Sequence, residues 1–267
     1  MTKWTTKIGA AIIVLLVLVA FCAPLIAPHD PNTYHLDMKF DGPHWGYWFG
    51  NDVDGRDLLS RIIYGARVSL GIGVAVVGIS TIVGSVIGLI AGYKGGIIDH
   101  IFLFITDVFL SFPGFLFAVA VAAFLSPSIL NIIIILSLKG WVGSARLVRG
   151  QTLALKEREF VLSGRAIGIS NLRMYFKHLL PNMIGPIIVN VSFSMAGVIM
   201  VESSLSFLGL GVPINTPSWG AMIDQGTQYL LIAPHLSIIP GIFIMLVVLG
   251  FNFLGDGLRD RFAPKGR

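Results

Sequence analysis

Apolar residues occur in long runs along this chain, and these runs leave few possible folds because each is bounded by charged residues or by glycine and proline clusters. A helix needs about 20 consecutive apolar residues to cross the hydrocarbon core of a bilayer. Only 12% of the 267 residues are charged, whereas a soluble domain has about one quarter. The sequence therefore predicts an all-α, polytopic membrane bundle of about six spans, at approximately 8–27, 68–92, 101–125, 129–145, 183–207 and 232–255.

The first and fourth runs carry additional information. Lys3 and Lys7 precede the first run, which exceeds the ~7–15 apolar residues of a signal-peptide core, so we expect a retained span. Lys139 interrupts the fourth run and makes it the weakest. The single cysteine, Cys22, lies in the first run and excludes a disulfide or a cysteine-ligated metal site within one chain.

Basic residues are distributed unevenly between the segments that join the runs. If the N-terminus is cytoplasmic, the cytoplasmic segments hold fifteen of the nineteen, including the eight from Lys139 to Lys177, and the opposite side holds only Lys39, Arg56, Arg61 and Arg67. The positive-inside rule then predicts two cytoplasmic termini and a folded loop over 28–67 on the outer side. Basic residues confined to membrane loops do not form the basic face of a nucleic-acid-binding domain, so we expect no nucleic-acid partner.

Two segments between and within the runs suggest specific packing. Gly84, Gly88 and Gly92 recur every four residues, which predicts a helix face that a neighbouring helix approaches closely. The charged segment 146–181 has the pattern of two short helices, with Gly168 at the end of the first and Ser170 as a cap of the second. It is either an interfacial element lying on the membrane or a coupling element that fits a groove on a cytoplasmic motor protein.

The same segment resembles the coupling loop of the permeases of bacterial binding-protein-dependent ABC importers. The family pattern is E-A-A, three residues, G, nine residues and I-x-L-P, and Gly168, Leu180 and Pro181 occupy matching positions. Leu162, Ser163 and Gly164 replace Glu-Ala-Ala, and His178 replaces the isoleucine. The resemblance implies that this loop, with Arg165, Gly168, Leu180 and Pro181, contacts an ATPase.

Further segments are similar to the peptide and nickel branch of that family, and in particular to its C-type permease. They are GNDVDGRDLLSRIIYGARVSLGIG, DVFLSFPGFLFA, GWVGSARLVRGQTLALKEREFV, ESSLSFLGLGVPINTPSWGAMI and NFLGDGLRDRF. The resemblance implies an N-terminal unit over 1–67, a permease domain over 68–267 and a location in the bacterial inner membrane. It also implies a second permease subunit, two ATPases and an extracytoplasmic solute-binding protein as partners.

The sequence contains no G-x-x-x-x-G-K-[ST] loop that could hold ATP phosphates. ATP and Mg are therefore expected on the partner ATPases, and we expect this chain to bind no cofactor and to have no catalytic residues. An intramembrane hydrolase would need a nucleophile or metal motif that is missing, and a secondary transporter would usually show two related halves. Neither alternative matches the sequence.

Polar residues within the runs are the remaining candidates for function. Asp107, Asn190 and Glu202 either line a translocation path or make hydrogen bonds between helices, because a charge at the bilayer centre costs at least ~2.5 kcal/mol. Six scattered histidines include no H-x-x-x-H pair, so no metal site is predicted. The absence of clustered ligands favours a di- or oligopeptide as the cargo, with nickel or a nickel chelate as the alternative.

Overall fold

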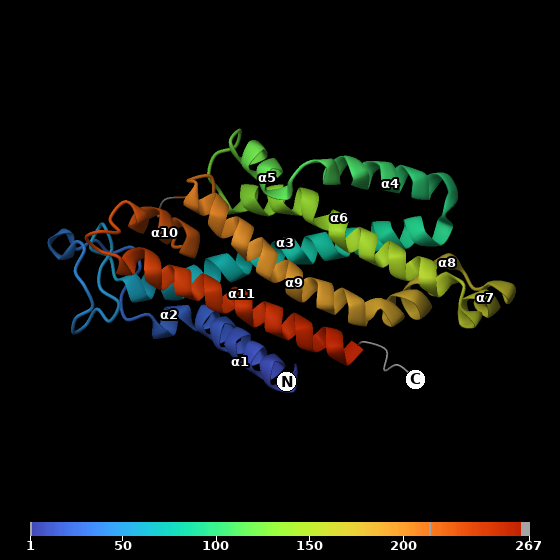
Figure 1. Ribbon diagram of the computed structural model, residues 1–267, viewed down its shortest axis with the longest axis horizontal. Helices are drawn as coiled ribbons and strands as arrows, with labels where there is room; N and C mark the ends of the chain where they lie inside the picture. Colours follow the sequence, from blue (N-terminus) through green and yellow to red (C-terminus); the bar gives the residue numbers. More distant parts are fainter. Residues whose placement is uncertain (1, 214, 263–267) are drawn as a thin grey trace.

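The computed structural model describes residues 2–213 and 215–262, and the regular elements in these ranges are helices, with no strand (Figure 1). In chain order they are α1 (Thr2–Phe21), α2 (Ala23–Ile26), a 3-10 turn (Leu36–Met38), α3 (Leu58–Lys94), α4 (Gly96–Ser111), α5 (Gly114–Ala122), α6 (Ile129–Lys156), α7 (Glu159–Ala166), α8 (Asn171–Arg173), a π-helical turn (Met174–Leu179), α9 (Leu180–Phe207), α10 (Trp219–Thr227) and α11 (His235–Phe262).

Five helical segments in the described ranges are long and apolar enough to cross a membrane, namely α1, α3, α6, the continuous run from α8 to α9, and α11. A sixth span forms if α4 and α5 are counted together. The prediction of a polytopic helical bundle with about six spans is therefore confirmed.

The predicted span 101–125 is wrong as a single straight helix. Helices α4 and α5 meet at an angle of 77°. Phe112, at the break, has extended backbone with ψ of 133°, as expected for a residue that precedes a proline, because the ring of Pro113 disfavours helical backbone before it. The sequence Phe-Pro-Gly thus divides this apolar run into two helices.

Helix α3 also differs from its prediction, since it begins at Leu58 rather than at residue 68 and extends over 37 residues. Asp57 caps its first turn by accepting a hydrogen bond from the backbone N–H of Ser60. The loop before α3 therefore covers 28–57 instead of 28–67, and a boundary at 67/68 falls inside one continuous helix. Arg61 and Arg67 lie on this helix and not in the loop.

The packing prediction for the glycine stripe is confirmed, because Gly84, Gly88 and Gly92 on α3 face α6, and this is the most extensive helix pairing among the described residues. An added Cβ at Gly84 would lie 2.8 Å from the backbone nitrogen of Ala145, and one at Gly88 would lie 2.9 Å from the Ala145 carbonyl carbon. These contacts are shorter than side chains tolerate, so the glycines set the distance between the two helices.

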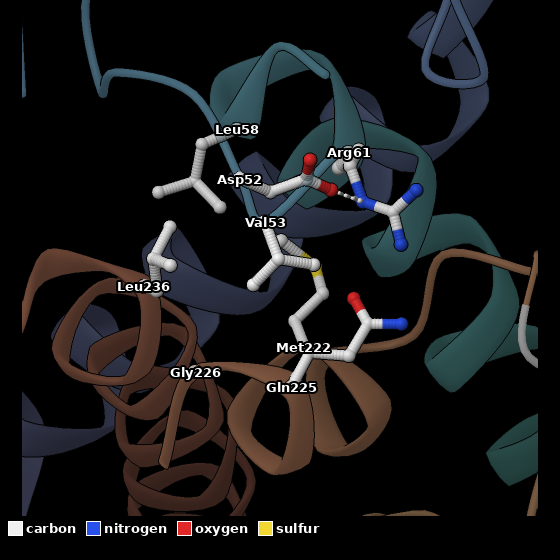
Figure 2. Close-up of a pocket in the computed structure, with 8 residues that line it drawn as sticks. All are labelled: Asp52, Val53, Leu58, Arg61, Met222, Gln225, Gly226 and Leu236. Atoms are coloured by element: carbon white, nitrogen blue, oxygen red, sulfur yellow. Dashed lines mark ion pairs between the residues drawn. The ribbon is translucent and has the colours of Figure 1, made fainter. Parts of the chain in front are cut away.

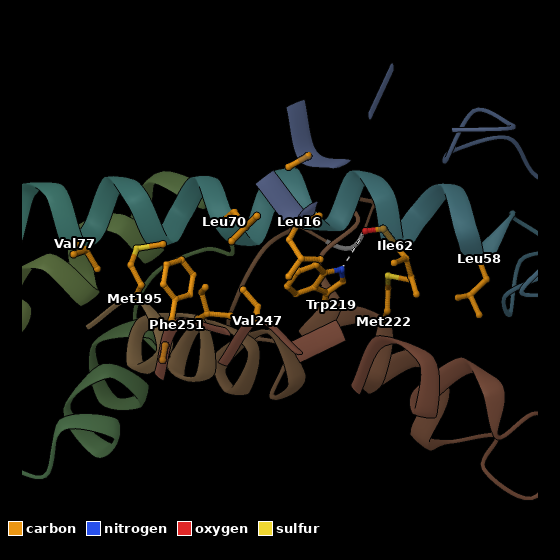
Figure 3. Packing of buried hydrophobic residues seen from close by; sticks show 14 of the residues in the cluster. Leu16, Leu58, Ile62, Leu70, Val77, Met195, Trp219, Met222, Val247 and Phe251 are labelled. Atoms are coloured by element: carbon orange, nitrogen blue, oxygen red, sulfur yellow. Dashed lines mark hydrogen bonds between the residues drawn. The ribbon is translucent and has the colours of Figure 1, made fainter. Parts of the chain in front are cut away.

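The largest buried cluster joins α1, α3, α9, α10 and α11 (Figure 3). Trp219 of α10 is completely buried in it, and its indole N–H donates a 3.1 Å hydrogen bond to the carbonyl of Ile62 on α3. The bundle is elongated, with α7 and α8 at one end and α10 with the loop 28–57 at the other (Figure 1). We call these the α7 end and the α10 end.

Candidate coupling loop and polar sites

The projecting hairpin at the α7 end consists of α7 and the turn that follows it. The sequence predicted one helix reaching Gly168, but α6 continues to Lys156 and α7 starts separately at Glu159. Gly168 has φ of 75°, and the turn is closed by hydrogen bonds from the N–H of Gly168 to the Arg165 carbonyl and from that of Ile169 to the Gly164 carbonyl, both 3.0 Å. This is the hydrogen-bond pattern of a helix that ends in a left-handed residue.

A small apolar core holds this hairpin on the end of α3. Its buried members come from five elements and are Leu89, Val148, Val161, Met174, Tyr175, Leu179 and Met183. Gly164, at the last position of the family's Glu-Ala-Ala triplet, packs against Met174, whose Cε would lie 2.6 Å from an added Cβ. Glycine in place of the family's alanine at position 164 therefore allows Met174 to pack closely against α7.

Arg165 links the hairpin to the last turn of α3. Its Nε donates a 3.1 Å hydrogen bond to the hydroxyl of Tyr93, and its guanidinium carbon lies 4.4 Å from the centre of the Tyr93 ring. The Tyr93 ring in turn meets Tyr175 edge to face at 5.0 Å. Hydrogen bond and cation–π contact together fix the orientation of α7 relative to α3.

Large apolar side chains are exposed at the α7 end, among exposed charged ones. Ile167 is 78% exposed and Leu172 is 69% exposed, and Phe176 lies nearby on the π-helical turn with 61% exposure. Pro181 is the second residue of α9, and Leu180, which begins that helix, is half-buried. Ser170 precedes α8, but its side chain makes no capping hydrogen bond, so that part of the prediction is wrong.

Asp107 lies on α4 and forms an ion pair with Arg146 on α6, while Thr106 accepts hydrogen bonds of 3.2 and 3.1 Å from the same guanidinium. Arg149, about one helical turn beyond Arg146 on α6, donates two hydrogen bonds of 2.5 and 2.7 Å to Asp99, which lies about two turns before Asp107 on α4. These paired carboxylates connect α4 to α6. The sequence had left Asp107 open between a path residue and an interhelical contact, and the structure shows the contact.

Asn190 and Glu202 both lie on α9 but in different surroundings. Asn190 donates a 3.1 Å hydrogen bond to Ser144 on α6 and borders a hollow of about 450 Å³. Glu202 is completely buried and accepts hydrogen bonds from Ser69 (3.2 Å) and Ser206 (2.9 Å). The structure does not bring Asp107, Asn190 and Glu202 together, and Glu202 has no surface through which a solute could reach it in this conformation.

Sequence analysis missed a buried ionic cluster at the α10 end, where Asp52 binds Arg56 and Arg61; Figure 2 shows the pair of Asp52 and Arg61. Oδ2 of Asp52 lies 2.8 Å from Nε of Arg56 and 3.2 Å from Nε of Arg61. Both arginine side chains are at most 1% exposed. Asp54 adds a second carboxylate to Arg56 at 2.8 Å. The alternation of Asp and Arg in NDVDGRD was a signal for such pairing.

A second set of contacts extends this cluster to the beginning of the loop. The Ser60 hydroxyl donates a 2.5 Å hydrogen bond to Asp57 and accepts one of 3.0 Å from the backbone N–H of His29. Below Asp52 and Arg61, residues of α10 and α11 enclose a hollow of only about 10 Å³ (Figure 2), which is about the space of one water molecule. The ionic cluster therefore connects the loop 28–57 to the spanning helices, and the hollow beside it has no room for a ligand.

The comparison with protein families decides the class of the chain. Residues 84–267 match the family described as "Binding-protein-dependent transport system inner membrane component". The chain belongs to this family of transport permeases. Residues 5–43 of the permease also match the "N-terminal TM domain of oligopeptide transport permease C".

Among the residues that the structure describes, no group of three or more His, Cys, Asp or Glu side chains could hold a metal ion.

Individual relatives agree with this assignment. The permease is 41% identical to the dipeptide transport system permease protein DppC of Alkalihalophilus pseudofirmus, over 97% of this chain and 85% of the relative. It is 44% identical to the glutathione transport system permease protein GsiD of Shigella dysenteriae, over 96% and 85%. A structure of the MetNI methionine ABC transporter has the same fold, with a TM-score of 0.56 and 17% identity over 76% of this chain and 96% of that one.

Proposed function

We propose that this permease is the C-type translocation subunit of an ATP-driven importer that carries di- or oligopeptides across the bacterial inner membrane. The observation that carries the proposal is the relationship to dipeptide and glutathione permeases, which extends over nearly the whole chain. The supporting structural feature is the α7 end, where exposed Ile167 of the hairpin and Leu172 of α8 offer apolar contacts to a partner.

The partners of the proposed complex are a second permease subunit, two ATPases and an extracytoplasmic solute-binding protein. The ATPases would bind the α7 end, because the hairpin there projects from the bundle and corresponds to the family's coupling loop. The α7 end and both termini then face the cytoplasm, and the loop 28–57 faces outward. The chain has no phosphate-binding loop of its own, so ATP and Mg would be bound by the ATPases.

Packing around α7 suggests how movement of an ATPase reaches the spans. Arg165 contacts Tyr93 at the end of α3, and Val161 lies in the same buried core as Val148 of α6. Helices α3 and α6 are held together by the glycine stripe. A displacement of α7 would therefore move α3 and α6 together, because a closely packed interface does not deform gradually.

Reconstitution of the complex in liposomes tests this function. Liposomes containing the permease, its second permease and both ATPases, supplied with the binding protein and internal ATP, are expected to accumulate labelled dipeptide. Omission of ATP or of the ATPases should abolish accumulation, and an excess of nickel should leave it unchanged. Saturable uptake of nickel or a nickel chelate without dipeptide uptake would reverse the choice of cargo.

A further inference from the structure

Lys139 lies deep within α6, although it had been counted with the basic residues of the cytoplasmic segments. It is ten residues from Ile129, where α6 begins, and a rise of 1.5 Å per residue places it roughly 15 Å along the helix. That distance is about half of the ~30 Å hydrocarbon core. Lys139 is thus a cation near the middle of a spanning helix, where ionisable residues are costly and usually functional.

The partners of Lys139 do not neutralise its charge. Its ammonium donates a hydrogen bond to the carbonyl of Phe112 at the break between α4 and α5, and it lies 5.8 Å from the centre of the Phe117 ring. No carboxylate in the described part of the chain lies within ion-pair distance of it, whereas Arg146 and Arg149 on the same helix each have an aspartate. Lys139 therefore carries a positive charge without a counter-ion.

The ammonium borders a hollow of about 220 Å³ between α5, α6 and α9. Small residues leave this hollow open, since Gly114, Gly140 and Gly197 are among those that line it. The volume is sufficient for a carboxylate with several waters. Non-helical backbone such as that at Phe112 is tolerated at membrane depth only where it is covered by protein or lines a water-filled cavity. The other residues that line the hollow are apolar or glycine, so the ammonium of Lys139 is the charged group that this hollow offers to a solute.

We propose that Lys139 attracts the carboxylate of the peptide as it passes through the membrane. This inference rests on the proposed function, which supplies a zwitterionic cargo. An ammonium group is a mobile point charge with three donors, and it can turn from the Phe112 carbonyl to a passing carboxylate. The hollow is open, so the interaction is weak, which suits a path that must release its solute.

The test compares Lys139 variants in the reconstituted importer. Lys139→Met removes charge and donor, Lys139→Gln keeps an N–H donor for the Phe112 carbonyl without the charge, and Lys139→Arg keeps the charge. We expect kcat/KM for a free-acid dipeptide to fall about tenfold in the Met and Gln variants, as for the loss of a hydrogen bond to a charged group, and to be largely retained in Arg. Lys39→Met, in the exposed loop, is the control for one lost positive charge and should transport normally.

Chemical rescue provides the second readout. In a Cys22→Ala chain, Lys139→Cys should show the same defect, aminoethyl methanethiosulfonate should restore uptake by replacing the cation, and the neutral methyl reagent should not. Wild-type uptake by Lys139→Gln would show that only the Phe112 carbonyl needs a donor and would overturn the inference. So would loss of the second permease during purification of Lys139→Met, which would indicate an ion pair between subunits.

The outcomes for this inference and for the proposed function remain separate. If the wild-type importer takes up no dipeptide, the proposed function fails. If the wild type takes up dipeptide and Lys139→Met matches it, the carboxylate site alone is refuted.

Discussion

The glycine stripe between α3 and α6 predicts that a Gly→Ala substitution changes the stability of the protein in opposite directions at two positions of α3. Gly88→Ala places a methyl group against the backbone of Ala145, 2.9 Å from its carbonyl carbon and 3.0 Å from its Cα. Gly78→Ala, on the same helix, places the methyl group in open space, with nothing within 4 Å. The first change is expected to destabilise the protein and the second to leave it unchanged or stabilise it.

The magnitudes follow from two effects. Alanine is favoured over glycine in a helix by about 1 kcal/mol, and both variants gain this. At position 88 the helices must separate by several tenths of an ångström, and overpacking of this kind costs about 1–3 kcal/mol. The net change is then a loss of up to ~2 kcal/mol at Gly88 and a gain of up to ~1 kcal/mol at Gly78.

Thermal unfolding of the two variants in detergent, followed by the loss of the monodisperse peak, measures the difference. A shift of about 2–4 °C per kcal/mol is expected for a chain of this size, so Gly88→Ala should unfold several degrees below wild type. Gly78→Ala should unfold at or above the wild-type temperature. Equal midpoints for the two variants would refute the view that the stripe sets the distance between α3 and α6.

Three further predictions concern the two ends of the bundle. Gly168→Leu should lower uptake per ATP hydrolysed, because the φ of 75° at this position strains a bulky residue. Gly168→Asn should retain more coupling, and equal ratios of uptake to hydrolysis in the two variants would contradict this prediction. Asp52→Ala should cost about 3–5 kcal/mol by leaving Arg61 without its buried partner, seen as poor recovery of folded protein, with Asp52→Asn less severe. In a cysteine-free chain, a cysteine that replaces Trp45, which is 97% exposed, should react with an impermeant thiol reagent added outside. A cysteine that replaces Ile167 should react only when the reagent reaches the cytoplasmic side. The reverse labelling would invert the proposed orientation.

Local patterns in the sequence were sufficient for the bundle and for one helix pairing. Gly84, Gly88 and Gly92 could be interpreted because a spacing of four residues places them on one face. The length of the apolar runs gave the spans. Hydropathy did not reveal the helix break at Phe112 and Pro113, because the run remains apolar through the bend. The sequence Phe-Pro-Gly is nevertheless a local signal for a break.

Distant contacts account for what could not be predicted. Arg61 suggested a loop because it is charged, and its pairing with Asp52 and its hydrogen bond to the Pro31 carbonyl allow it to be buried in the first turns of α3. Asp107 left two interpretations open because its partner, Arg146, is on another helix. Lys139 falls within the predicted span 129–145 but was counted with the cytoplasmic basic residues, whereas α6 continues past it to Lys156.

The continuity of α3 restricts how the length of this chain can change. The helix carries Arg61 near one end, the glycines in its second half and Tyr93 at the other end, with no break between them. Inserting or deleting one residue near its middle would rotate everything beyond that point by about 100°. The glycines would turn away from α6 and Tyr93 away from Arg165, while Arg61 stayed in place. Homologous permeases should therefore keep the number of residues between these positions constant and accept insertions in the turn between α5 and α6.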